Sequence, residues 1–155
     1  MAHSPIDAPH EPALEILSQR ELAWPRAQVW DAYAQPERLA RWWGPAGFSN
    51  RFASFDFRVG GDWHFTMHGP DGKDYANHVR FLVLEPPARL VLEHVNAPHF
   101  VAHVELAPTA GGAHTRLQFR MRFETAALRD AVAVYALPAN EQNFDRLQAE
   151  LARSP

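Results

Sequence analysis

The segment HTRLQFRMRF, residues 114–123, decides the class of fold. Its apolar side chains recur at every second position, at Leu117, Phe119 and Met121. The positions between them are polar: His114, Arg116, Gln118, Arg120 and Arg122. Because side chains alternate between the two faces of a strand, one face lies on a core and the other meets water. We therefore predict an antiparallel sheet whose arginine face is solvated.

The same two-residue period recurs upstream, between strong turn signals. Pro70-Asp71-Gly72 and residues 109–112 are typical of hairpin turns, and Pro86-Pro87 interrupts a strand. Strands connected by hairpins form a meander. These signals predict strands near residues 48–57, 63–68, 75–84, 89–95, 100–106 and 115–123.

After Thr125 the period becomes helical. The apolar stripe of this helix comprises Leu128, Val132, Tyr135, Phe144, Leu147 and Leu151. Pro138 lies within the stripe, and an internal proline removes one backbone hydrogen bond. We expect a kink or break near Leu137, with a second segment running to about Ala152. No other predicted element is long enough to cover the apolar face of the sheet.

The N-terminal third completes the architecture. Residues 14–23 predict a first strand, Trp24-Pro25 opens a short helix, and Pro36 starts a second one that ends at Gly44-Pro45. Residues 1–12 carry three prolines and predict a flexible arm. The expected fold is a single α+β domain over residues 13–155. A curved antiparallel sheet of about six or seven strands grips a long C-terminal helix, and two short helices follow strand 1.

The composition excludes several classes of function. The net charge is −3 with scattered basic residues, so we expect no nucleic-acid partner. The absence of cysteine excludes disulfides and thiolate metal sites, and it fits a reducing compartment. The first dozen residues lack the basic and apolar regions of a signal peptide, and no apolar run approaches the ~18 residues of a membrane span. We expect a cytoplasmic protein with no membrane partner.

Metal binding and nucleophilic catalysis find little support. His64 and His68 are four residues apart on one predicted strand, which separates them by about 13 Å. Only pairing across strands could unite two of the nine histidines. No Gly-x-Ser-x-Gly motif occurs. We predict no metal, no cofactor and no catalytic residue, and a binding protein rather than an enzyme.

Several short motifs occur together in a characteristic order. They are Ala23-Trp24-Pro25-Arg26, Arg41-Trp42-Trp43-Gly44-Pro45, Gly47-Phe48, Gly60-Gly61 with Trp63, Gly69-Pro70-Asp71-Gly72 with Tyr75 and Asn77, and Phe144-Asp145-Arg146-Leu147. In these motifs the chain resembles the START-like superfamily, also called SRPBCC or Bet v-like helix-grip proteins. Within it, the chain is similar to the branch named after the activator of Hsp-90 ATPase. The resemblance covers roughly residues 14–152.

The resemblance implies a hydrophobic or aromatic small molecule bound in a cavity between the sheet and the helix. The candidate ligand-binding residues are Trp42, Trp43, Phe48, Phe65, Met67, Tyr75, Asn77, His94, Phe100, Met121 and Tyr135. The apolar members could instead simply pack the core. Strand parity carries Asn77 inward with Tyr75, and a buried polar group needs a partner. Asn77 and His94 could therefore orient a ligand, or bond each other or water.

Two other functions remain open at this stage. One is a protein-interaction module of the chaperone ATPase activator type, which needs an exposed patch in place of an internal cavity. The other is an enzyme similar to the polyketide cyclases and dehydratases, which needs an inward acid–base pair within hydrogen-bond reach. The protein is expected to be a monomer or a homodimer.

Overall fold

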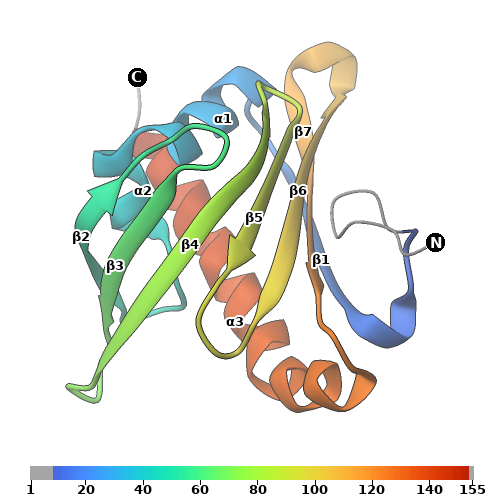
Figure 1. Ribbon diagram of the computed structural model, residues 1–155. Coiled ribbons are helices and arrows are strands. Elements are labelled where there is room, and N and C mark those ends of the chain that lie inside the picture. Colours follow the sequence, from blue (N-terminus) through green and yellow to red (C-terminus); the bar gives the residue numbers. More distant parts are fainter. Residues whose placement is uncertain (1–8, 154–155) are drawn as a thin grey trace.

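The computed structural model describes residues 9–153, which form one seven-stranded sheet, a long helix and two short helices (Figure 1). The strands are β1 (Glu15–Leu22), β2 (Ser49–Phe55), β3 (Asp62–His68), β4 (Asp74–Glu85), β5 (Arg89–His94), β6 (Phe100–Thr109) and β7 (His114–Arg122). The helices are α1 (Arg26–Ala34), α2 (Pro36–Trp42) and α3 (Ala126–Arg153), with single 3₁₀ turns η1 (Pro12–Leu14) and η2 (Ala110–Gly112).

The strand order β1-β7-β6-β5-β4-β3-β2 explains where the helices lie. Strands β2 to β7 form an antiparallel meander, and β1 pairs with β7 along its whole length. The chain must therefore cross from one sheet edge to the other between β1 and β2, and α1 and α2 make this crossing. The predicted helix-grip architecture is confirmed.

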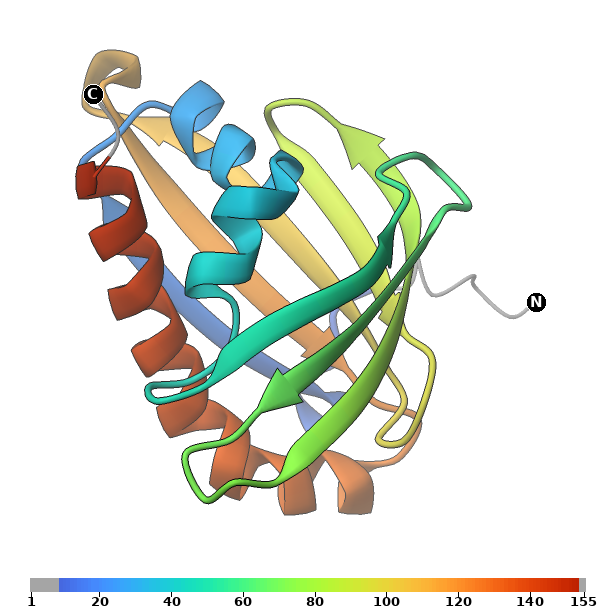
Figure 2. The ribbon, with the colours of Figure 1, turned by 90° about the vertical axis from the view of Figure 1, so that its left-hand side faces the viewer.

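The sheet curves around α3, which runs along its concave side (Figure 2). Register shifts between Phe52 and Ser54 on β2, and between Phe81 and Val83 on β4, mark irregularities of the bulge type. A bulge bends its strand and increases the local twist. The two short helices lie together at one end of the sheet, beside α3.

One core fills the space between the sheet and the helices. Its largest fully buried side chains are Trp42, Trp63, Phe81, Phe123, Ile16, Leu22, Leu39, Leu90, Leu92, Leu117, Leu147 and Leu151. Leu117, Phe119 and Met121 point inward from β7, as the alternation in its sequence predicts, and Phe123 directly after the strand is buried as well.

Helix α3 differs in part from its prediction. It is one helix from Ala126 to Arg153 with Pro138 inside it, so the chain does not break there, and its first turns run at an angle to the rest, in agreement with the kink that was the other predicted outcome (Figure 1). The buried stripe in its first half consists of Ala133 and Ala136, and Tyr135 is 75% exposed. Successive helix positions differ by about 100°, so a face centred on Ala136 turns Tyr135 outward.

The predicted solvated arginine face is only partly correct. Arg120 and Arg122 both contact the carboxylate of Glu15 on the neighbouring strand β1, at 3.3 and 3.2 Å. Arg122 also bonds Glu11 at 2.8 Å and the Pro9 carbonyl at 3.0 Å. These contacts hold the end of the predicted N-terminal arm on β7. Residues 1–8 of that arm lie outside the described residues.

Candidate functional site

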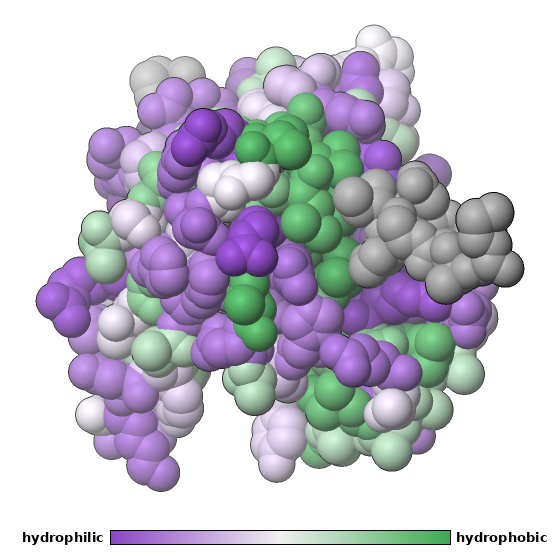
Figure 3. All heavy atoms as spheres, viewed as in Figure 1, coloured by the Kyte–Doolittle hydropathy of each residue, from purple (hydrophilic) through white to green (hydrophobic). Residues whose placement is uncertain are grey.

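A cavity of about 620 Å³ opens beside the concave side of the sheet. Its walls come from β3, β4, β5 and the start of β6, the loop between β5 and β6, and the segment that joins α2 to β2. The lining residues are Trp43, Pro45, Phe48, Phe65, Met67, Asp74, Tyr75, Ala76, Asn77, Val79, Leu92, His94, Asn96, Ala97, Pro98 and Phe100. Figure 3 shows the surface hollowed on the side of the β3–β4 hairpin that faces α3.

Strand pairing brings most of the predicted site residues together here. Register places Phe65 opposite Asn77 and Met67 opposite Tyr75, so alternate positions of two adjacent strands form one wall. The predicted residues that line the cavity are Trp43, Phe48, Phe65, Met67, Tyr75, Asn77, His94 and Phe100. Their role in binding a ligand stays a prediction.

Three predicted site residues do not line this cavity. Trp42 is buried between α1 and α2, where its indole donates to the Ala32 carbonyl at 2.9 Å. Met121 is buried farther along the sheet, where its sulfur lies 3.6 Å from the Asn140 amide. Tyr135 was predicted to face the cavity, and this is wrong because the helix face turns it into solvent.

Sequence reasoning missed several lining residues. The two-residue period that carries Tyr75 and Asn77 inward also carries Val79, and the sequence contained this signal. Asn96 and Pro98 belong to the loop between β5 and β6, which has no period. Only the folded chain places that loop against β4, where Asn96 accepts from the His78 backbone N–H at 2.9 Å and donates to the Ala76 carbonyl at 2.9 Å.

His94 is the most buried polar side chain of the cavity, at 8% exposure. Its Nδ1 lies 2.8 Å from the Pro98 carbonyl, and its Nε2 lies 2.8 Å from Oδ1 of Asn77. The ring stacks on Phe100 with centroids 4.9 Å apart. Asn77 in turn donates to the Tyr75 carbonyl at 3.0 Å. Asn77 and His94 thus bond each other, one of the alternatives that the sequence left open.

We expect His94 to make the protein less stable in mild acid. Burial lowers the pKa of this imidazole below its ordinary value of 6.5, because the charged form is poorly solvated. Below pH 6.5 the unfolded chain therefore binds this proton more readily than the folded chain, and the free energy of unfolding falls as the pH falls. Urea unfolding at pH 7.5, 6.5 and 5.5 should show a smaller decline for His94→Gln than for the wild type. Parallel declines would contradict this assignment.

The cavity wall between α2 and β2 is held by α3. The guanidinium of Arg146 donates to four backbone carbonyls: Nη1 to Trp43, Gly44 and Pro45, each at 3.0 Å, and Nη2 to Arg41 at 2.9 Å. Two neighbours on the helix assist, since Asn143 donates to the Trp42 carbonyl and Gln142 accepts from the Ala46 N–H. Sequence reasoning gave Arg146 no role, although it lies within one of the motifs that carry the resemblance.

Gly44 allows this wall to approach β3. Its φ of +97° lies in the region that favours glycine. A Cβ at this position would lie 2.5 Å from the terminal methyl of Met67, a residue that lines the cavity. Glycine at this position therefore permits the turn, and a Cβ there would displace the flexible end of the Met67 side chain.

The sequence profile of the family described as "Activator of Hsp90 ATPase homolog 1-like protein" matches residues 23–152. The chain belongs to this family. The match contains α1, α2, six of the seven strands and nearly all of α3, and therefore the entire wall of the cavity. No curated protein matches the chain.

Solved structures of three other bacterial proteins share the architecture. A protein from Rhodobacter sphaeroides is 27% identical, with a TM-score of 0.83, and the alignment covers 96% of this chain and 98% of that one. A protein from Nitrosomonas europaea is 25% identical, with a TM-score of 0.84 and coverage of 94% and 99%. The AHSA1 protein from Silicibacter pomeroyi, at 19% identity, has a TM-score of 0.71 with coverage of 89% and 97%, and this likeness concerns the fold alone.

Among the described residues, no helix combines the length and the apolar character that a membrane span requires.

Proposed function

We propose that this protein binds a hydrophobic or aromatic small molecule in the cavity. The observation that carries the proposal is a volume of about 620 Å³ with aromatic walls and few polar groups. Pockets for small molecules typically measure about 300–1,000 Å³ and combine apolar walls with a few convergent polar groups. Apolar burial would supply most of the affinity, at about 25 cal/mol per Å².

Three of the polar lining residues come from β4, the end of β5 and the loop that follows it. Asn77 and His94 are bonded to each other, and Asn96 follows on the adjacent loop. A ligand with one polar end and an aromatic or aliphatic body fits this division. The polar end would meet the amides and the imidazole, and the body would lie against Trp43, Phe65 and Met67.

The contacts of His94 favour a role in positioning a ligand over a role in proton transfer. Both ring nitrogens already lie 2.8 Å from an oxygen atom, one of Pro98 and one of Asn77. Asparagine does not titrate, so this pair lacks the second acid or base that a cyclase or dehydratase would need. We therefore favour a binding protein over an enzyme.

Two tyrosines provide a matched test of the binding site. Native mass spectrometry and a thermal-shift series with naphthol, anilinonaphthalene sulfonate and dodecanoate should identify a probe that stabilises the protein in a dose-dependent way. Tyr75 lines the cavity and is 44% exposed, whereas Tyr135 lies on α3 outside it. Tyr75→Ala should weaken probe binding about tenfold, and Tyr135→Ala should leave it unchanged. Equal effects of the two substitutions, or no stabilising probe, would contradict the proposal.

A protein-interaction role is the second candidate, and one observation favours it. Val134, Tyr135 and Leu137 are exposed apolar or aromatic side chains close together on α3, and Figure 3 shows hydrophobic atoms gathered over the first turns of this helix. Such a patch is typical of a partner-binding surface. If this candidate is correct, the protein should alter the ATPase rate of an Hsp90, Val134→Asp should abolish the effect, and Tyr75→Ala should retain it. The cytoplasmic location and the monomeric or dimeric state stay predictions.

A further inference from the structure

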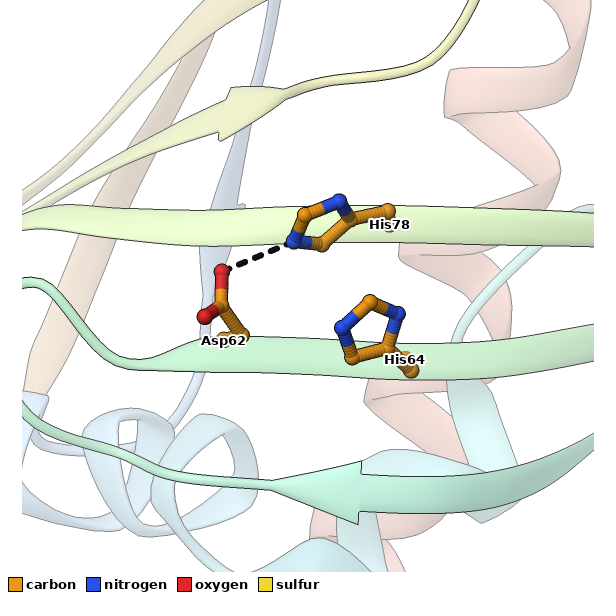
Figure 4. Close-up of side chains that lie close together, drawn as sticks. All are labelled: Asp62, His64 and His78. Carbon is orange, nitrogen blue, oxygen red and sulfur yellow. Dashed lines mark hydrogen bonds and ion pairs between the residues drawn. The ribbon is translucent and has the colours of Figure 1, made fainter.

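Three side chains that can bind a metal gather on the outer face of the sheet, away from the cavity. Asp62 and His64 are two residues apart on β3 and therefore share a face, while Trp63 between them is buried in the core. The register of β3 and β4 places His64 directly opposite His78. Figure 4 shows all three side chains on the same side of the two strands. From the sequence alone, His64 could be compared only with His68 on the same strand, which is too distant to share a metal ion. The pairing of β3 with β4, which the sequence does not show, brings His78 beside His64.

The geometry of the three side chains is already close to that of a binding site. The two imidazole rings stack with centroids 4.1 Å apart and an interplanar angle of 19°. Nε2 of His78 lies 2.7 Å from Oδ1 of Asp62 (Figure 4). One ligand atom from each of the three residues lies within 4.8 Å of the other two.

We propose that Asp62, His64 and His78 bind a divalent transition metal ion, with Zn²⁺ the best match. Two imidazole nitrogens and one carboxylate oxygen are ligands that Zn²⁺ takes, whereas Ca²⁺ and Mg²⁺ prefer oxygen ligands. Ligands of one zinc ion at 2.0–2.1 Å lie about 3.3 Å apart, so the ligand atom of His64 must approach by up to about 1.5 Å, while the Asp62–His78 pair, at 2.7 Å, must open slightly. His64 is exposed and has room to turn. Three protein ligands leave at least one coordination position open to water.

Arg80 is the cation that competes for this site. Its Nε lies 3.3 Å from Oδ1 of Asp62, and its Nη1 lies 3.9 Å from the carboxylate of Glu93 on β5. A carboxylate has two oxygens, and Glu93 offers a second anion, so Arg80 keeps a partner when Asp62 binds the metal. Glu93 also bonds His99 at 2.8 Å. Arg80 therefore keeps Glu93 as an anionic partner when Asp62 binds the metal.

The ion would connect the two strands that form one wall of the cavity. Phe65 and Asn77 pair across β3 and β4 with their side chains on the inner face, one position beyond His64 and His78. Since the ion binds only the folded arrangement, it should raise the melting temperature as its concentration increases.

The test uses the full chain without a histidine tag, stripped with EDTA and dialysed. Titration calorimetry with ZnCl₂ should show about one ion per chain, and Co²⁺ should give visible absorption bands of a protein-bound ion. His64→Gln should weaken Zn²⁺ binding at least about tenfold, because one of three ligands is lost. His68→Gln is the matched control, since His68 lies on the same face about 13 Å from His64 and pairs with Asp74 instead. It should change the affinity less than twofold.

Three outcomes would overturn the proposal: a dissociation constant of the wild type weaker than about 1 mM, equal binding by His64→Gln, or an equal loss in His68→Gln. Asp62→Asn provides a second variant that keeps the volume of the side chain. Melting temperatures without metal verify that each variant folds, and the Zn²⁺-dependent increase should disappear in Asp62→Asn and His64→Gln alone.

Discussion

Replacing Arg146 by methionine is expected to disorder the cavity wall and to lower the free energy of unfolding by about 3 kcal/mol. The guanidinium of Arg146 donates to four carbonyls between Arg41 and Pro45. Nη1 has two hydrogens to share among three carbonyls, and water can replace the exposed bond from Nη2 to Arg41, so the loss corresponds to one or two full bonds. Hydrogen bonds from a charged donor contribute about 1.5–3 kcal/mol each. The affinity for an aromatic probe such as anilinonaphthalene sulfonate should fall more than tenfold, because Trp43 and Pro45 lose their fixed positions.

Two variants control this experiment. Arg146→Lys retains the charge but not the planar fork of donors, so its loss of stability should be intermediate. Arg116→Met removes an exposed arginine of β7, on the outer face of the sheet, and should leave both stability and probe binding nearly unchanged. Urea unfolding and fluorescence titration measure the two quantities. If Arg146→Met binds the probe like the wild type, the α2–β2 segment holds its shape without α3.

Replacing Glu150 by glutamine is expected to lower the free energy of unfolding by about 3 kcal/mol. Glu150 is 3% exposed, and its carboxylate accepts from Arg38 at 3.1 Å and from Arg41 at 2.8 and 2.7 Å. These contacts join the end of α3 to α2. Removing one partner of a buried ion pair typically costs about 3–5 kcal/mol, and the partial exposure of Arg41 places this case at the low end.

The pH dependence of the Glu150 effect has a definite sign. Hydrogen bonds from Arg41, and then from Arg38, lower the pKa of this carboxyl below its ordinary value of 4.5. Its stabilising contribution is therefore complete above pH 4.5 and is lost as the pH falls through the lower pKa of the folded state. As the pH falls below 4.5, the difference in unfolding free energy between the wild type and Glu150→Gln should therefore shrink.

Glu141→Gln is the matched control, because the side chain of Glu141 is 54% exposed and pairs with Arg20 on the surface. Exposed ion pairs contribute about 0–1 kcal/mol, so this variant should stay close to the wild type at every pH. Equal losses from the two substitutions would show that burial of the Glu150 carboxylate adds nothing to its ion pairs.

Arg146→Met and Glu150→Gln both test how strongly the site depends on α3. The cavity is lined by strands and by the segment after α2, yet Arg146 fixes that segment and Glu150 fixes α2 itself. A ligand-binding site built in this way is sensitive to substitutions that never contact the ligand. Binding and stability therefore have to be measured together for each variant.

Much of the fold was predictable, because its signals are local. The alternation at residues 114–123, the turn at Pro70-Asp71-Gly72 and the helical period after Thr125 each act within a few residues. Strand parity also predicted Asn77 on the face of Tyr75, and both line the cavity. The motif resemblance predicted the family that the profile match shows.

The predictions failed for residues whose place depends on how two segments of the chain pack against each other. Tyr135 belongs to an apolar period on α3, but which side of that period faces the sheet depends on how closely Ala133 and Ala136 approach it. Trp42 is a large aromatic residue of the kind that lines cavities, but the packing of α2 on α1 buries it against α1 instead.

The sequence by itself therefore determined the elements, their order and the inward faces of the strands at residues 75–84 and 115–123, because backbone geometry imposes these over a few residues. Register and helix docking were decided by the tertiary structure alone, since they depend on contacts between residues far apart in the chain. Register places His64 opposite His78, and docking brings Arg146 to the carbonyls of residues 41–45. Neither pairing has a local signal, and both proposed sites depend on such pairings.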